Sequence, residues 1–476
     1  MDMEKFVEAI VKVNGVLNDF AWGPIMLVLL VGTGVYLTVR TRFLQVRRFG
    51  YIMKNTVGSL FRKQGKDSGK NLTPFQAVTT ALAGTVGTGN IAGVTGAIFV
   101  GGPGAAFWMW VSAFFGMCTK YAEIALAMKY RETGADGLHR GGPMYYIQNG
   151  LGKNWKWLAC IFALLGGLAS FGIGNIAQSS EIAGAIVGLS GVSGKAAVNV
   201  SMIVGIGLAL LVGIVIVGGV KRIGQVTSYL VPFMAVFYIL AGLIVIAMRI
   251  TQVPAAFAVI FREAFSFRAI GSGVFGYVIT LAMRQGFARG VFSNEAGLGS
   301  APIAHASSST EEPAEQAMWG VFEVFIDTIV ICTITCLTVV LSGMELGAEA
   351  LGAFASKGAA AVAAFNSILP GSLGGIIIQI SLLFFALSTI LSWSYYGERC
   401  WGYLTKDNKV IGLIYKFVFI LFCIVGATGS GALMWDIADT LNGLMAIPNL
   451  IALLALSGVT AQITREYFYK DNDLRK

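Results

Sequence analysis

The chain has 476 residues, of which 56% are hydrophobic and only 12% are charged. A soluble globular domain carries roughly 25% charged residues, so this composition excludes an ordinary soluble protein and indicates one that crosses a membrane several times. The net charge of +9 does not indicate a nucleic-acid partner, because the basic residues gather in short loops beside the apolar segments.

Eleven apolar segments along the chain are long enough to cross a lipid bilayer as helices. They predict an all-α polytopic membrane protein with about 11 transmembrane helices. The predicted spans cover residues 20–38, 74–98, 104–128, 156–188, 197–219, 224–248, 270–293, 316–342, 373–397, 410–428 and 431–457.

The loop between the first two spans gives the predicted orientation. It carries nine basic residues, from Arg40 to Lys70, against the single acid Asp67. Short basic loops stay in the cytoplasm, so the first span is predicted to run inward, with the N-terminus outside. If the chain changes side at each of the eleven spans, the tail 458–476 lies in the cytoplasm. We expect a multi-pass protein of the cell's inner (plasma) membrane.

The second span is interrupted by glycine. Residues 83–96 read AGTVGTGNIAGVTG, in which Gly84, Gly87 and Gly89 alternate with small and polar residues. Glycine disfavours helix, and opened backbone is tolerated in hydrocarbon only where it faces protein, water or a solute. Interrupted spans form the substrate and ion sites of secondary transporters, so this span predicts a small-solute transporter.

An opened helix at 83–90 offers two kinds of ligand. The freed amides of Gly87, Thr88 and Gly89 would begin the outer half-helix, where a carboxylate is favoured. The freed carbonyls near Ala83 and Val86 would end the inner half-helix and could bind a small cation. The alternative is that these small residues only let helices approach closely.

The seventh span, 270–293, is also rich in glycine, and we expect it to be interrupted around 279–283. It lies five spans after the first interrupted one, in the opposite predicted direction, which indicates an inverted repeat. Two long outer segments, 249–269 and 343–372, could cap an outer vestibule or lie on the surface as helices.

Three stretches carry a resemblance to a known family. The chain resembles the alanine or glycine:cation symporter family, which is similar to the five-plus-five inverted-repeat transporters of the amino acid–polyamine–organocation superfamily and has one extra N-terminal helix. The matching stretches are TALAGTVGTGNIAG (80–93) followed by GGPGA (101–105) and FWMW (107–110), RGVFSNEAGLGSAP (289–302), and STILSWSYYGE (388–398).

The resemblance implies domains and a set of site residues. The expected divisions are an N-terminal segment 1–72, a first repeat 73–248, a second repeat 249–457 and the tail 458–476. The implied sodium ligands are the carbonyls of Ala83 and Val86 and the hydroxyls of Ser388 and Thr389. The implied substrate residues are Thr85, Thr88, Gly89, Asn90, Gln178, Thr280, Met283 and Trp393.

Several acids lie inside the predicted spans, and such residues are functional by default in a membrane. Asp327 is the deepest, and it predicts either ion or proton coupling or a buried salt bridge. The polar cluster 293–297 follows the seventh span and is interpreted as a hinge or inner gate, not as a substrate contact.

The sequence therefore predicts a sodium-coupled symporter that imports alanine or glycine by alternating access. The alternatives are a proton-coupled transporter of the same fold and an amino acid receptor without transport. An enzyme is not expected, because no nucleophile, base and metal ligands cluster at one depth, and the only histidines, His139 and His305, lie in predicted loops. Apart from the coupling sodium ion, no cofactor is expected. The expected partners are the substrate and the lipid bilayer, and the oligomeric state stays open.

Overall fold

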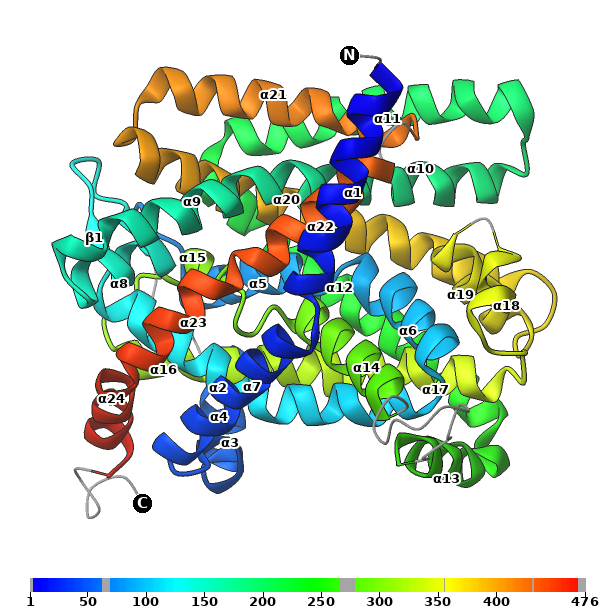
Figure 1. The fold of residues 1–476 in the computed structure, drawn as a ribbon, viewed down its shortest axis with the longest axis horizontal. Helices are drawn as coiled ribbons and strands as arrows, with labels where there is room; N and C mark the ends of the chain where they lie inside the picture. Colours follow the sequence, from blue (N-terminus) through cyan, green and yellow to red (C-terminus); the bar gives the residue numbers. More distant parts are fainter. Residues whose placement is uncertain (1–2, 62–68, 266–278, 355, 430–431, 470–476) are drawn as a thin grey trace.

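The computed structural model describes residues 3–61, 69–265, 279–354, 356–429 and 432–469, and these residues are almost entirely helical (Figure 1). One short antiparallel hairpin interrupts the helices, formed by β1 (Glu132–Thr133) and β2 (His139–Arg140). The prediction of an all-α polytopic protein is confirmed.

The first half of the chain, up to the gap at 266–278, contains thirteen α-helices and five shorter helical turns. In chain order they are α1 (Met3–Ala21), α2 (Pro24–Arg40), α3 (Leu44–Arg47), α4 (Phe49–Asn55), η1 (Val57–Phe61), α5 (Pro74–Thr85), η2 (Gly89–Gly93), α6 (Val94–Gly101), α7 (Gly104–Lys129), α8 (Pro143–Gly150), η3 (Lys153–Trp155), α9 (Lys156–Phe171), η4 (Gly172–Ile176), α10 (Ala177–Ser190), α11 (Gly194–Val217), α12 (Gly219–Met248), η5 (Ile250–Gln252) and α13 (Val253–Ala264).

The second half continues from residue 279. Its elements are α14 (Ile279–Asn294), α15 (Ala301–His305), α16 (Pro313–Val324), η6 (Phe325–Cys332), α17 (Thr333–Leu341), α18 (Ala348–Gly352), α19 (Lys357–Asn366), α20 (Leu373–Thr405), α21 (Lys409–Ala427), α22 (Ala432–Leu444), α23 (Ala446–Ala455) and α24 (Ser457–Tyr469).

In the part of the chain that the structure describes, each of the eleven predicted spans corresponds to a helix or a run of joined helices, and residues 270–278 of the seventh span lie outside it. Within the described residues, eight helical stretches are long and apolar enough to cross a membrane, and the bent pair α5 and α6 makes a ninth. The other two predicted spans correspond to α7 and α14, which carry Lys120, Glu123, Arg284 and Arg289. The described part of α14 is only 16 residues long, and the charges lower the mean hydropathy of both helices, which pack closely against each other inside the bundle.

Three spans contain a π-helical turn: η2 in the second span, η4 in the fourth and η6 in the eighth. A π-turn adds a residue to one turn of helix and often marks a functional site. In this fold the turns hold or adjoin Asn90, Gln178 and Asp327, which meet in the site described below.

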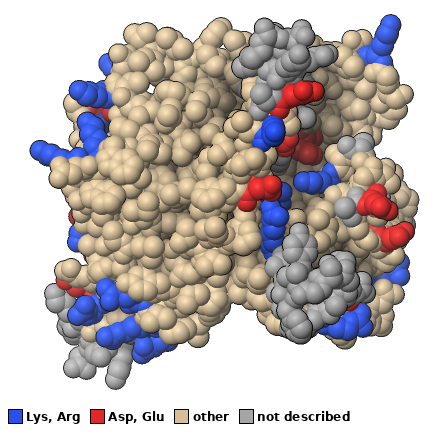
Figure 2. Space-filling model, viewed as in Figure 1, with Lys and Arg blue, Asp and Glu red and all other residues tan. Residues whose placement is uncertain are grey.

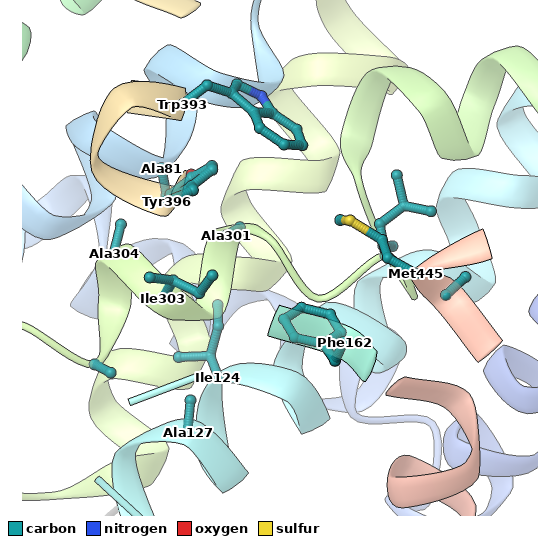
Figure 3. Packing of buried hydrophobic residues seen from close by; sticks show 14 of the residues in the cluster. Ala81, Ile124, Ala127, Phe162, Ala301, Ile303, Ala304, Trp393, Tyr396 and Met445 are labelled. Atoms are coloured by element: carbon teal, nitrogen blue, oxygen red, sulfur yellow. The ribbon is translucent and has the colours of Figure 1, made fainter. Parts of the chain in front are cut away.

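The interior of the bundle is apolar and closely packed. Many of its residues are small, which lets several helices converge on the short α15 (Figure 3). Residues labelled at this junction are Ala81 of α5, Ile124 and Ala127 of α7, Phe162 of α9, Ala301, Ile303 and Ala304 of α15, Trp393 and Tyr396 of α20, and Met445 between α22 and α23.

The seventh span is described only in its second part. We expected an interruption around 279–283; α14 runs as continuous helix from Ile279 to Asn294, and residues 270–278 of the predicted span lie outside the described residues. The chain leaves the helix at Glu295, which has a φ of 55°, and passes through Gly297 and Gly299 with φ of 92° and 86°. Glycine adopts such values without strain, so α14 is followed by a sharp change of direction at 295–300.

The outer segment 343–372 packs into the bundle. Helix α19 buries Ala360, Ala361, Ala364 and Phe365 and contacts η2, α6 and α20. Of the two predicted roles for this segment, capping the region outside the broken helix agrees with these contacts.

Candidate functional site

The second span is broken where the glycine pattern predicts. Helix α5 ends at Thr85, the outer half begins at Gly89, and the two halves are bent by 45°. The side chain of Asn90 holds the open turn, because its Oδ1 accepts a 2.8 Å hydrogen bond from the amide of Gly87. The segment is thus opened and held in one shape.

Helix α20 lies directly against this break. A Cβ atom at Gly87 would be 2.6 Å from the Thr389 hydroxyl oxygen, and one at Gly84 would be 3.0 Å from the oxygens of Ser392 and Tyr396. The two glycines therefore let α20 approach the opened backbone closely, at the level of its hydroxyl side chains.

The four predicted sodium ligands lie in this contact, and all are buried. The Ser388 hydroxyl is 3.4 Å from the Ala83 carbonyl oxygen. The hydroxyls of Ser388 and Thr389 each donate a 2.9 Å hydrogen bond to the carbonyl of Phe385, as hydroxyls in membrane helices commonly do. A hydroxyl that donates a hydrogen bond still has oxygen lone pairs with which to bind a cation. These oxygens therefore fit a hard ion such as sodium.

A small cavity adjoins the break. It encloses about 20 Å³, close to the space of one water molecule, and most of its wall comes from α5, η4, α10, α14, α20 and α22. Its lining residues are Gly84, Thr85, Gly87, Gly89, Ile173, Gln178, Phe292, Glu295, Thr389, Trp393 and Asn442. Four of the eight predicted substrate residues, Thr85, Gly89, Gln178 and Trp393, are in this wall.

Two further predicted substrate residues, Thr88 and Asn90, lie just behind the wall. The Thr88 hydroxyl donates a 3.0 Å hydrogen bond to Oε1 of Gln178, which fixes the direction of the Gln178 amide. Asn90 is fully buried and bonds to Gly87 and Asp327, so its side chain holds the break and is not part of the wall.

The last two predicted substrate residues come from the start of α14. Met283 is partly buried, packs against the apolar core and does not line the cavity. The side chain of Thr280 lies outside the described residues. From α14, Phe292 lines the cavity, and it was not among the predicted site residues.

Glu295 lines the cavity although it was not among the predicted substrate residues. We expected the cluster 293–297 to be a hinge or inner gate, yet Glu295 lines the cavity. Its Oε1 accepts a 3.2 Å hydrogen bond from Nε1 of Trp393, and its Oε2 accepts a 2.5 Å bond from Ser300. The signal in the sequence was the pair Gly297 and Gly299, which marks a break directly after this acid.

Asp327 lies behind the broken helix. Its carboxylate accepts hydrogen bonds from Nδ2 of Asn90 at 2.6 Å and from the hydroxyls of Ser293 and Thr328, each at 2.8 Å. The carboxylate thus connects η6 to both interrupted spans. A buried carboxylate surrounded by hydroxyl and amide groups can hold a cation or a proton.

A buried lysine supplies positive charge to this region. Lys120 of α7 is fully buried and interacts electrostatically with Glu123, Glu295 and Asp327. Glu123 in turn accepts hydrogen bonds from the amide of Gly297 and from Asn449. These contacts fix the segment 295–300 and hold Glu295 at the cavity.

The comparisons with known proteins agree on one family. The family model described as "Sodium:alanine symporter family" matches residues 6–476. The chain is 47% identical to "Sodium/alanine symporter AgcS" of Methanococcus maripaludis over 469 residues, 98% of each chain. It is 37% identical to "Probable sodium/glutamine symporter GlnT" of Bacillus subtilis, over 98% of this chain and 95% of that protein.

One solved structure is similar in fold. It is the crystal structure of MhsT in complex with L-phenylalanine, with a TM-score of 0.57 and 14% sequence identity. The match covers 83% of this chain and 99% of MhsT. The arrangement of helices is therefore one already observed in a solved structure.

Proposed function

This chain belongs to the sodium:alanine symporter family, a family of transporters and not of enzymes, and we propose that it carries alanine and glycine by alternating access. It is a multi-pass membrane protein that couples amino acid transport to sodium. The observation that carries the proposal is the opened backbone at residues 86–88, which faces both a cavity and the hydroxyls of α20.

The substrate carboxylate would bind at the start of the outer half-helix. The amides of Thr88 and Gly89 lie at that terminus, where an N–H group has no partner within the helix. These amides and the positive end of the helix dipole favour an anion. Gly89 lines the cavity without a side chain, so a carboxylate could approach its backbone closely.

Sodium would bind on the other side of the same break. The carbonyls of Ala83 and Val86 end the inner half-helix, and the hydroxyls of Ser388 and Thr389 lie opposite. An ion held by both α5 and α20 would favour the arrangement in which these helices are close. Because the substrate uses the same break, each ligand would increase the affinity for the other.

The size of the cavity supports a small substrate. Gln178, Phe292 and Trp393 enclose a space of about 20 Å³, so even alanine requires these side chains to move apart. A relative carries glutamine in its name, but a side chain of that length would need a much larger rearrangement here. We therefore place alanine and glycine before glutamine.

Proton coupling is the second candidate, and Asp327 favours it. The carboxylate is fully buried and bonded to Asn90, so a change in its charge would act directly on the broken helix. Sodium remains the preferred coupling ion, because the Ser388 hydroxyl lies near the Ala83 carbonyl and the Thr389 hydroxyl faces the break at Gly87, which supports a site made of oxygen ligands.

Uptake of labelled alanine into proteoliposomes tests the proposal. An inward sodium gradient should drive accumulation of alanine, and a proton gradient alone should not. Uptake that does not depend on sodium would overturn the sodium site, and binding without accumulation would indicate a receptor.

We also propose that the N-terminus is outside and the C-terminus is cytoplasmic. The accessibility of cysteines introduced at the two termini would check this orientation.

A further inference from the structure

A second, larger cavity lies next to the one at the broken helix. It has a volume of about 210 Å³, and α1, α14 and α22 contribute to its wall. Its lining residues are Asn18, Trp22, Arg284, Gln285, Ala288, Arg289 and Asp439. We call it the outer cavity, because α14 and α22 lead from it to the smaller inner cavity described above.

The two cavities are stacked along the same pair of helices. On α14, Phe292 lines the inner cavity and Arg289, three residues earlier, lines the outer one. On α22, Asn442 lines the inner cavity and Asp439, again three residues earlier, lines the outer one. Three residues are close to one helical turn, so the outer cavity lies one turn beyond the inner cavity on both helices.

Phe292 separates the two spaces. A Cβ atom at Gly89 would lie 3.2 Å from the Phe292 ring, so the ring covers the broken helix. The Arg289 guanidinium lies 5.3 Å from the ring centroid, and the Trp22 ring lies 6.3 Å away. The Phe292 ring therefore contacts Gly89 of the inner cavity and lies near two residues of the outer cavity.

The outer cavity carries separated charges of both signs. Figure 2 shows acidic and basic side chains gathered in one recess of a face that is otherwise largely uncharged. Arg284 is paired with Asp19 at 3.2 Å, but among the ion pairs of the described residues none includes Arg289. Arg289 therefore has its positive charge available to a ligand.

Asp439 provides the opposite charge. Its Oδ2 accepts a 3.1 Å hydrogen bond from Asn18, whereas its Oδ1 is buried and has no hydrogen-bond partner within the described part of the chain. A buried carboxylate oxygen without a donor is costly, so this position favours a ligand that brings a donor, above all a cationic one. The backbone of Asp439 is fixed by Nε1 of Trp22, which donates to its carbonyl at 3.2 Å.

A third cation supports an anion at Arg289. Lys357 of α19 has its pKa lowered, first by Arg289 and then by burial, while Asp439, Glu181 and Asp436 act in the opposite direction. Lys357 and Arg289 therefore repel each other, and an anionic group between them and the acids would relieve the repulsion.

We propose that the outer cavity is a second binding site for a zwitterionic amino acid, which holds the carboxylate at Arg289 and the ammonium at Asp439. The volume of about 210 Å³ is sufficient for alanine without any rearrangement. The site rests on the proposed substrate class, and it would hold the amino acid before Phe292 moves to admit it to the inner cavity.

Equilibrium binding of labelled alanine to the purified full-length chain tests the site. In the presence of sodium we expect two molecules of alanine per chain. Arg289→Gln and Asp439→Asn should each weaken the second site by about tenfold or more, because each removes a charged hydrogen-bond partner. Glu349→Gln is the control, since Glu349 is an exposed acid of α18 and does not line the cavity.

A variant that blocks the inner cavity isolates the outer one. Gly87→Val would place side-chain atoms against Thr389, because even a Cβ atom lies 2.6 Å from that hydroxyl. We expect Gly87→Val to retain one alanine per chain and to do so without sodium. In that background alanine should bind at least about tenfold better than propionate, which lacks the ammonium, and adding Asp439→Asn should abolish the difference.

The outcomes separate this site from the proposed function. Suppose that the wild-type chain takes up alanine with sodium but binds only one molecule of alanine, and that Gly87→Val abolishes this binding. The outer site is then wrong and the proposed function stands. If uptake fails while Gly87→Val still binds one alanine that Asp439→Asn removes, the outer site stands alone. If Gly87→Val does not fold, the same measurement is made in the wild-type background. Equal numbers of bound alanine molecules in Asp439→Asn and in the control Glu349→Gln would overturn the site.

Discussion

Asn90 and Asp327 join two parts of the chain that lie 237 positions apart: Nδ2 of Asn90 donates a 2.6 Å hydrogen bond to Oδ1 of Asp327. The other end of the same amide accepts the Gly87 amide that opens the second span. A single side chain therefore transmits the state of a buried carboxylate to the backbone that would bind substrate. The predictions below follow from this connection and from the contact between α5 and α20.

Asp327→Asn should lower alanine uptake by about 10- to 100-fold. A hydrogen bond to a charged group contributes about 1.5–3 kcal/mol, and the variant loses the charge at three such bonds. Uptake into proteoliposomes measures the change, with Asp436→Asn as the control acid. Under sodium coupling the remaining uptake still depends on sodium; under proton coupling the wild-type response to pH would disappear in Asp327→Asn.

Thr389→Ala should raise the sodium concentration needed for half-maximal uptake by about tenfold. The variant removes an oxygen that faces the broken helix at Gly87. If its contact with sodium is as strong as a hydrogen bond, its loss reduces the free energy of sodium binding by about 1–1.5 kcal/mol. Ser381→Ala is the matched control, because Ser381 is on the same helix and its hydroxyl bonds to the carbonyl of Ile377. If both variants matched the wild type at low sodium, the cation site would be misplaced.

Gly87→Ala should abolish transport even though it adds a single methyl group. The new Cβ atom would lie 2.6 Å from the Thr389 hydroxyl, so α5 and α20 could no longer meet at the break. Gly184→Ala provides the comparison, since a Cβ atom there meets nothing within 4 Å and alanine favours helix. Equal uptake by the two variants would show that the contact between α5 and α20 is not required.

Trp393→Phe should reduce uptake by about tenfold or more while the chain stays folded. The phenyl ring keeps an apolar wall, but Oε1 of Glu295 loses its donor, and an unsatisfied buried group costs about 1–3 kcal/mol. The control is Trp401→Phe, two turns away on α20, whose Nε1 bonds to the carbonyl of Gly167 outside the cavity. A similar loss in both variants would assign the effect to general packing of the helix.

The sequence predicted the break in the second span well because the cause is local. Gly84, Gly87 and Gly89 have no side chains to stabilise a helix, and polar neighbours such as Asn90 can bond to the opened backbone. The number of spans was predictable for a similar reason, since each apolar segment reflects the thickness of a bilayer. The repeat boundary at 248 and 249 stays a prediction.

The end of the seventh span was not predictable in the same way. The glycines at 271–276 lie outside the described residues, so an interruption there stays a prediction, and from Ile279 onward α14 is helical and packs along α7 and α6. The chain leaves the helix at Glu295, where Glu123 and Asn449 from distant helices hold Gly297. Such long-range contacts decide where the helix ends, and a single sequence does not contain them.

The shared use of α14 and α22 by the two cavities has a consequence for inhibitor design. Phe292 and Arg289 both lie on α14, and Asn442 and Asp439 both lie on α22, so a rigid molecule filling both spaces would contact each helix at two levels and restrain it from turning. A blocker confined to the outer space would only compete with arriving amino acid and could be outcompeted. Elongated compounds with an alanine-like head and a charged far end are thus the scaffolds best suited to locking this carrier.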